Sequence, residues 1–187
     1  MVIAVIAIIV VLVLLALFGV VGFNKLRTSD VSAQEALGGI DVQLTRRAEL
    51  IPNLVETVKG YAAHEREVLE EVTRARTSVA TAAAGSNVPA KAAADAELQG
   101  ALVKLNATAE AYPDLKANQN FLELQKQLAD TENQLAFARQ FYNDAVATLN
   151  KLVVTIPWML FSGVAGVGKR DFYQAPAGQQ QAPSVQF

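Results

Sequence analysis

The sequence predicts an all-α membrane protein, with an N-terminal transmembrane helix followed by an elongated antiparallel bundle of long helices. The first observation behind this is an uncharged apolar run over residues 2–23. The second is the recurrence of apolar residues at three- and four-residue steps through most of the remaining chain, which is the periodicity of helices. The third is the length of 187 residues, which leaves room for one modest domain beside an anchor.

The apolar run is long enough to cross a bilayer. At 1.5 Å per residue, residues 2–23 extend about 33 Å, against roughly 30 Å for a hydrocarbon core. The alternative is a cleavable secretory signal, which needs basic residues first and an apolar stretch of only about 7–15 residues. Nothing basic precedes this run, and no cysteine is available for acylation. We therefore expect a retained anchor over residues 1–24.

The first charges after the anchor predict its orientation. Lys25 and Arg27 follow the apolar run directly, while only the α-amino group precedes it. Basic residues favour the cytoplasmic side of a membrane. We expect the N-terminus outside and the C-terminal domain in the cytoplasm.

The next helical pattern contains a proline. Residues 46–65, RRAELIPNLVETVKGYAAHE, hold Pro52 inside an amphipathic pattern. Proline lacks an amide hydrogen and would clash with the carbonyl of Ala48, so we expect a helix kink at Pro52 or a new helix that starts there. The apolar stripe that begins at Ile51 continues to about Ala84, which predicts a single buried helical face up to that point.

Turn signals separate the following elements. Residues 85–89, GSNVP, combine a helix stop with a helix start. A second helix is expected from Ala90 to about Ala111, because leucines recur there at helical steps. The Tyr-Pro-Asp sequence and two asparagines in residues 111–120 predict a chain reversal.

The most regular pattern follows the reversal. Two sets of residues at seven-residue steps form a seam sustained over residues 121–156, which predicts a long helix packed in a bundle. Pro157 ends it. We therefore divide the rest of the chain into a bundle over 25–156, an apolar and glycine-rich membrane-proximal segment over 157–173, and a low-complexity tail over 174–187. The seam comprises Phe121, Leu128, Leu135, Tyr142, Leu149 and Ile156, with Leu124, Thr131, Ala138, Ala145 and Leu152.

Two partial motifs do not support a catalytic or binding site. Residues 163–170, GVAGVGKR, match part of a phosphate-binding loop but end in Arg170, where the motif needs Ser or Thr. The expected preceding element is also a helix instead of a strand. His64 precedes Glu65 as in a zinc-protease helix, but Val68 stands where the second histidine would be. We interpret the first as a linker and the second as structural or surface residues.

Composition argues against enzymatic chemistry. With no cysteine and one histidine, nucleophile–base pairs are nearly excluded. The net charge of −2 and the absence of a basic stripe exclude general attraction to nucleic acid. We predict no enzyme, no catalytic residue, no cofactor, no metal site and no nucleic-acid partner.

Polar residues beside the apolar seams form one candidate site. Three of them share one side of the last helix, and three others cluster around Pro52. Because charges that leave water must be paired, we hypothesise a partly buried polar network that sets helix register. The alternative is that most of these residues are solvent-exposed. The candidate network comprises Arg47, Glu49, Asn53, Glu132, Arg139 and Asn143.

Two long stretches resemble the LemA family of bacterial membrane proteins: residues 46–65, quoted above, and residues 111–146, AYPDLKANQNFLELQKQLADTENQLAFARQFYNDAV. The resemblance extends over about residues 24–173. It implies an inner-membrane anchor with its N-terminus outside, a cytoplasmic domain of long antiparallel helices, and no established enzymatic activity. The sequence departs from the family pattern at residues 37–39 and 163–168. The motif positions, none implied to be catalytic, are Arg47, Leu50, Ile51, Pro52, Asn53, Leu54, Tyr61, Tyr112, Pro113, Asn120, Phe121, Glu132, Arg139, Tyr142 and Asn143.

These observations predict a non-enzymatic scaffold that self-associates in the bacterial inner membrane, with the lipid bilayer and other copies of the chain as partners. The alternative is a regulatory adaptor that binds a membrane protease, kinase or other membrane protein through its cytoplasmic bundle. Four apolar residues after Pro157 are expected to dock at the bilayer surface or on a neighbouring subunit, or to pack on the end of the bundle. They are Trp158, Met159, Leu160 and Phe161.

Overall fold

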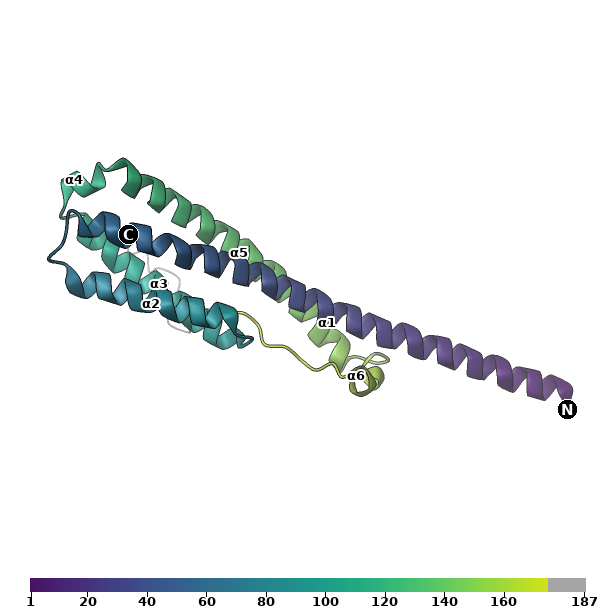
Figure 1. Cartoon of the computed structure of the whole chain (residues 1–187). Coiled ribbons are helices and arrows are strands. Elements are labelled where there is room, and N and C mark those ends of the chain that lie inside the picture. Colours follow the sequence, from purple (N-terminus) through teal and green to yellow (C-terminus); the bar gives the residue numbers. More distant parts are fainter. Residues whose placement is uncertain (175–187) are drawn as a thin grey trace, which may run out of the picture. The chain divides into compact units, whose positions relative to one another are not determined.

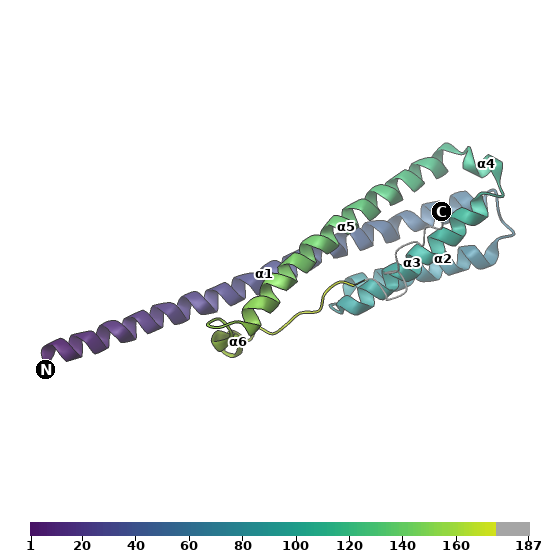
Figure 2. The ribbon, with the colours of Figure 1, turned by 180° about the vertical axis from the view of Figure 1, so that it is seen from behind.

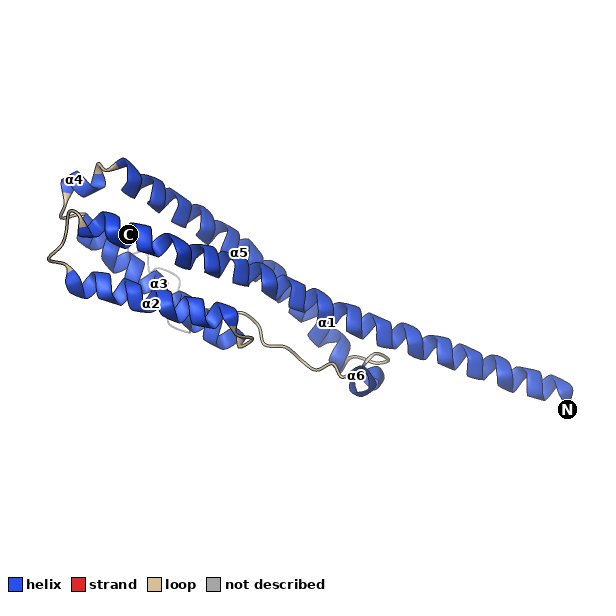
Figure 3. Ribbon diagram, in the orientation of Figure 1, coloured by secondary structure: helices blue, strands red, loops and turns tan. Residues whose placement is uncertain are grey.

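The computed structural model describes residues 1–174 and confirms the all-α class. Every regular element among these residues is a helix, and none is a strand (Figure 3). In chain order the helices are α1 (Val2–Lys59), α2 (Arg66–Ala84), α3 (Val88–Ala109), α4 (Pro113–Lys116), α5 (Gln119–Val154) and α6 (Met159–Ala165) (Figure 1).

The first helix contains the expected span. α1 is long and apolar enough to cross a membrane, and none of its most apolar stretch is buried within the protein. Leu12, Leu14 and Leu15 each expose 60% of their surface. Side chains this apolar are stable in such a position when lipid surrounds them.

α1 extends beyond the predicted anchor but ends before the predicted apolar stripe does. It continues without interruption through Pro52 and ends at Lys59, so a kink at Pro52 stays a prediction. The expectation of one helical face up to Ala84 is wrong, because α2 begins only at Arg66. The apolar spacing is maintained across the break, since the turn buries Ala62 at 1% exposure. Its amide donates to the carbonyl of Val58 at 2.8 Å, which closes the turn directly after α1.

The predicted stop and start between α2 and α3 are confirmed. α2 ends at Ala84, and the Gly85 amide donates to the carbonyl of Ala82 at 3.1 Å. Asn87 then caps α3, because its side-chain oxygen accepts a hydrogen bond from the amide of Ala90 at 3.0 Å. The short connection folds α2 and α3 into a hairpin with a core of alanine, valine and leucine side chains.

The seam of α5 is buried over most of its length. Phe121, Leu135 and Leu149 are at most 1% exposed. The last predicted position, Ile156, is 78% exposed instead, because α5 ends at Val154 before the seventh-residue step is completed.

The chain divides into two compact units, to which α1 and α5 both contribute. We call residues 1–36 with 141–171 the anchor unit, and residues 37–140 with 172–174 the bundle unit. The structure describes the bundle unit as far as Gln174. Apart from that residue, the tail predicted over 174–187 lies outside the described residues.

The segment after α6 is held inside the anchor unit by specific hydrogen bonds. Gly166 ends α6 in the left-handed conformation, with φ of 63°, which favours glycine. The Asn150 side chain then bonds the backbone of Arg170 twice, each time at 2.9 Å. Arg170 Nε donates to Asp30 Oδ1 at 2.8 Å, and the Tyr142 hydroxyl donates to the carbonyl of Asp171 at 2.8 Å. The part of the GVAGVGKR pattern after α6 is therefore fastened to α1 and α5.

Candidate functional site: a buried charge cluster and the pocket beside it

The bundle unit contains a buried cluster of charges centred on Asp95 of α3, which is 4% exposed. Arg47 Nη1 of α1 lies 2.7 Å from Asp95 Oδ1. Arg139 Nη2 of α5 contacts the other carboxylate oxygen, Oδ2. The hydroxyl of Tyr173 donates a hydrogen bond to the same oxygen at 3.0 Å. Three segments that are distant in sequence therefore meet at one carboxylate.

A second carboxylate completes the cluster. Glu132 Oε2 lies 2.8 Å from Arg47 Nη1, and Glu132 Oε1 accepts from Arg139 Nη1 at 3.2 Å. Arg47 Nη2 also donates to the side-chain oxygen of Gln99. Two guanidinium groups thus face two carboxylates. This balance offsets the cost of removing the charges from water.

The spacing of α3 positions these groups. Lys91, Asp95 and Gln99 follow one another at four-residue steps and so share one face of the helix. Lys91 is fully buried, pairs with Asp41 of α1, and donates to the carbonyl of Ala83 at 2.8 Å. Because Asp41 and Arg47 both bind α3, two ion pairs fix the register of α1 against α3.

The protonation states of the cluster follow from burial and charge. Burial raises the pKa of Tyr173, and the negative charge of Asp95 raises it further, so the phenol stays protonated and donates. Burial lowers the pKa of Arg139, but Asp95 and Glu132 outweigh this effect and the net pKa is raised. The cluster therefore holds charged arginine beside neutral tyrosine.

Tyr173→Phe is expected to test this arrangement through pH. The wild type should be more stable near neutral pH by about 1.5–3 kcal/mol, the typical contribution of a hydrogen bond to a charged group. Because the raised pKa of Tyr173 lies above the value of about 10 in the unfolded chain, its contribution is complete below that pH. The stability difference should then shrink by about 1.4 kcal/mol per unit above pH 10. Denaturant unfolding of both proteins across this pH range measures the difference in their stability. A stability difference that does not change with pH would contradict the raised pKa of Tyr173.

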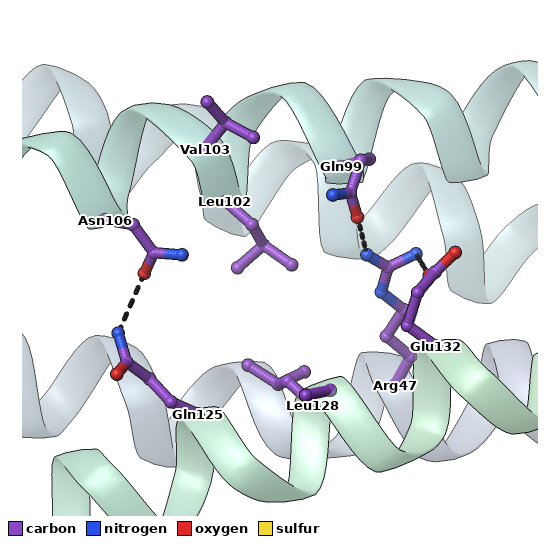
Figure 4. Close-up of a pocket in the computed structure, with 9 residues that line it drawn as sticks. Arg47, Gln99, Leu102, Val103, Asn106, Gln125, Leu128 and Glu132 are labelled. Carbon is purple, nitrogen blue, oxygen red and sulfur yellow. Dashed lines mark hydrogen bonds and ion pairs between the residues drawn. The ribbon is translucent and has the colours of Figure 1, made fainter.

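A pocket of about 360 Å³ adjoins the cluster within the bundle unit. Arg47 and Glu132 lie at one end and a hydrogen bond of 3.1 Å from Gln125 Nε2 to Asn106 Oδ1 lies at the other, with apolar side chains between (Figure 4). The terminal nitrogens of Arg47 already bind Asp95, Glu132 and Gln99. The pocket lining has no nucleophile–base pair. It is lined by Arg47, Gln99, Leu102, Val103, Asn106, Gln125, Leu128, Ala129 and Glu132.

The structure brings together part of the predicted network. Arg47, Glu132 and Arg139 meet in the charge cluster, whereas Glu49 and Asn53 are exposed on α1. Asn143 lies on the part of α5 that belongs to the anchor unit.

Sequence reasoning missed three members of the cluster. The four-residue spacing of polar residues along the alanine-rich α3 was a usable signal for Asp95 and Gln99. Tyr173 had no such signal, because it reaches Asp95 only after the chain has returned from α6 to the bundle unit.

The partial motifs have structural contacts. His64 is exposed, and Glu65 accepts a hydrogen bond from the hydroxyl of Tyr112 at 2.9 Å. Residues 1–174 contain no group of three metal-ligating side chains that could hold a metal ion. In the GVAGVGKR pattern the first residues belong to α6, and the side chain of Arg170 binds Asp30.

A second group of predicted residues lies in the anchor unit. The ring of Trp158 stacks near Phe18 at 6.2 Å between centroids, and that of Phe161 meets Phe18 edge-on at 5.5 Å. Trp158 and Phe161 are partly covered, whereas Met159 and Leu160 are exposed.

Comparison with known proteins gives a family match over most of the chain. The LemA family matches residues 36–187. Magnetosome proteins MamQ 1 and MamQ 2 of Paramagnetospirillum magneticum are each 24% identical over 180 residues, which cover 83% of this chain and 66% of theirs. Protein LemA of Metamycoplasma hominis is 24% identical over 133 residues, covering 71% of this chain and 59% of its own. The chain thus spans between 59% and 66% of the length of these curated relatives.

Proposed function

Because the chain belongs to the LemA family, matched over residues 36–187, we propose that it is a non-enzymatic, membrane-anchored helical scaffold that self-associates in the bacterial inner membrane. Its association with a membrane is supported by the apolar helix α1 and by the family.

The observation that carries self-association is an exposed aromatic pair on α5. Phe137 and Phe141 are one helical turn apart and expose 74% and 67% of their surface. Val42 and Val103 of the bundle unit are also more than half exposed. Adjacent large aromatic side chains left in water favour an interface, and a second copy of α5 offers the same apolar face in return.

The absence of enzymatic activity is supported by the engagement of the charged groups. Asp95, Glu132 and both arginines of the cluster bind one another, so their charges stabilise the packing of α1, α3 and α5. A general acid or base needs a group free to exchange protons with a substrate. We assign the cluster to helix register.

Crosslinking in native membranes tests the scaffold. The chain has no cysteine, so Phe137→Cys introduces the only reactive thiol. A short bis-maleimide reagent should convert much of this variant to a dimer, because the two copies of α5 face each other. Glu67→Cys, which is exposed on α2 and not on the α5 face, is the control and should crosslink far less.

Mass measurement of the wild type in mild detergent completes the test. A uniform homo-oligomer is expected, and Phe137→Ser with Phe141→Ser should reduce its mass to that of the monomer. In intact cells the Phe137→Cys thiol should be protected from a membrane-impermeant maleimide, as required by a cytoplasmic bundle. A monomer at every concentration, with no crosslinked dimer, would refute self-association.

The alternative is a regulatory adaptor, and one groove favours it. Between the end of α1 and α2 lies an open groove of about 600 Å³, with Val55 and Leu69 beside charged side chains such as Lys59 and Arg74. Such a mixed surface suits another protein. A monomer that is recovered with a second protein at fixed stoichiometry would favour the adaptor over the scaffold.

A further inference from the structure

We propose that α6 and the turn before it form a membrane-surface contact, which lies in the headgroup and upper acyl region of the bilayer beside the end of the α1 span. The occupant of its exposed apolar face is lipid. This inference concerns the anchor unit alone and does not depend on self-association.

The segment that contains α6 contacts the apolar span of α1 directly. Phe18 lies inside the uncharged run of α1, and both Trp158 and Phe161 pack against it. The ring of Phe161 also lies on Gly22, where an added Cβ would clash with it. Both views show α6 beside α1 (Figure 1 and Figure 2). A residue that contacts Phe18 is therefore at the level of the span.

The position of Phe18 along α1 indicates how deep α6 lies in the bilayer. Phe18 lies five residues before Phe23, the last residue of the uncharged run, which is about 7.5 Å along the helix. Helices that lie in the membrane interface bury their apolar face by about 5–10 Å. Tryptophan is enriched at this depth, because its ring is apolar and its indole N–H is polar. Because Trp158 and Phe161 pack on Phe18, they lie at this interfacial depth.

The exposed face of α6 and of the turn before it is apolar. Residues 152–168 carry no charge and are bracketed by Lys151 and Lys169. Leu160 and Val164 are one turn apart on α6 and expose 68% and 79% of their surface, and Ile156 in the turn before α6 exposes 78%. α6 leaves α5 at a bend of 105°, so this apolar face is carried on a separate short element.

Basic residues lie beside this apolar face. Lys25 Nζ lies 4.5 Å from the centre of the Trp158 ring. Lys169 is exposed directly after the uncharged stretch, and Arg27 follows Lys25 on α1. Basic residues beside an apolar face favour a surface of anionic lipid. Continuity with the span favours lipid over a second copy, because the bilayer already surrounds Phe18.

Single-cysteine labelling of the full chain in lipid nanodiscs tests the proposal. Leu160→Cys and Val164→Cys carry an environment-sensitive NBD probe, in discs of mixed zwitterionic and anionic phospholipid that hold one copy each. Both probes should shift to the blue, and lipids with a nitroxide near the headgroup should quench them more than lipids with a nitroxide near the chain end. Val42→Cys, an apolar position of the bundle unit that is 62% exposed, is the control and should keep its aqueous emission.

Two glycines of α1 provide a matched pair of variants. Gly22→Ala forces its Cβ into the Phe161 ring, whereas a Cβ at Gly19 would meet Phe161 at 3.9 Å, an ordinary contact. Lipid quenching at position 160 should fall in Gly22→Ala and stay unchanged in Gly19→Ala, while α1 keeps both proteins in the disc. The sole tryptophan, Trp158, reports independently on the same contact, with a red shift expected only in Gly22→Ala.

The outcomes separate lipid from other occupants. Probes at 160 and 164 that stay aqueous in a disc-inserted protein would overturn the proposal. A blue shift that appears only in discs with two copies, without lipid quenching, would overturn it in favour of a second copy. Neither result would bear on the crosslink expected at Phe137.

Discussion

Asp95→Ala is expected to lower the free energy of unfolding by about 3–5 kcal/mol, because it removes one partner of a buried ion pair and leaves the other charge uncompensated. Arg47 and Arg139 would then share one carboxylate, that of Glu132. The hydroxyl of Tyr173 would lose its acceptor as well. Urea unfolding of the full chain in mild detergent, followed by helical circular dichroism, measures the loss.

Asp130→Ala is the control for this variant. Asp130 is exposed on α5, so its removal should change stability by no more than about 0.5 kcal/mol. Asp95→Asn keeps the shape of the side chain without its charge and should give an intermediate loss. If Asp95→Ala costs no more than Asp130→Ala, the cluster does not hold the helices in register.

Val10→Lys combined with Leu14→Lys is expected to release the protein from the membrane. Both residues lie near the middle of the uncharged run and expose at least half of their surface. A lysine at the centre of a spanning helix costs about 3 kcal/mol, so two cost about 6 kcal/mol, roughly four orders of magnitude in partitioning. Alkaline carbonate extraction of membranes should recover the variant in the supernatant and the wild type in the pellet.

A swap that keeps hydropathy is the control for the span. Val10→Leu with Leu14→Val changes the same two positions and should leave the protein in the pellet. Retention of the double-lysine variant in carbonate-washed membranes would show that α1 does not span them.

Most of the fold was predictable because it depends on local patterns. The start of α3 after residues 85–87, the extent of α5 and the apolar length of α1 all follow from periodicity, capping residues and turn residues. The break after Lys59 was missed for a physical reason. The turn buries Ala62 at a position that a continuous helix would also have buried, so the apolar spacing does not record the change of direction.

The candidate site was predictable only in part. Arg47, Glu132 and Arg139 were identified because they flank apolar seams, but Glu49 and Asn53 share a local sequence with Arg47 and still face solvent. A helix rotates by about 100° per residue, so neighbours in sequence point in different directions. Which of them is buried depends on where α3 and α5 contact α1.

The sequence alone determined the class of this protein: one apolar span, then long helices with no chemistry-bearing motif, because hydropathy and periodicity are properties of neighbouring residues. Only the tertiary structure decided which charges leave water, since Asp95 gains its partners from α1, α5 and the segment after α6. It likewise decided that Trp158 and Phe161 pack on α1, because that contact joins residues about 140 positions apart.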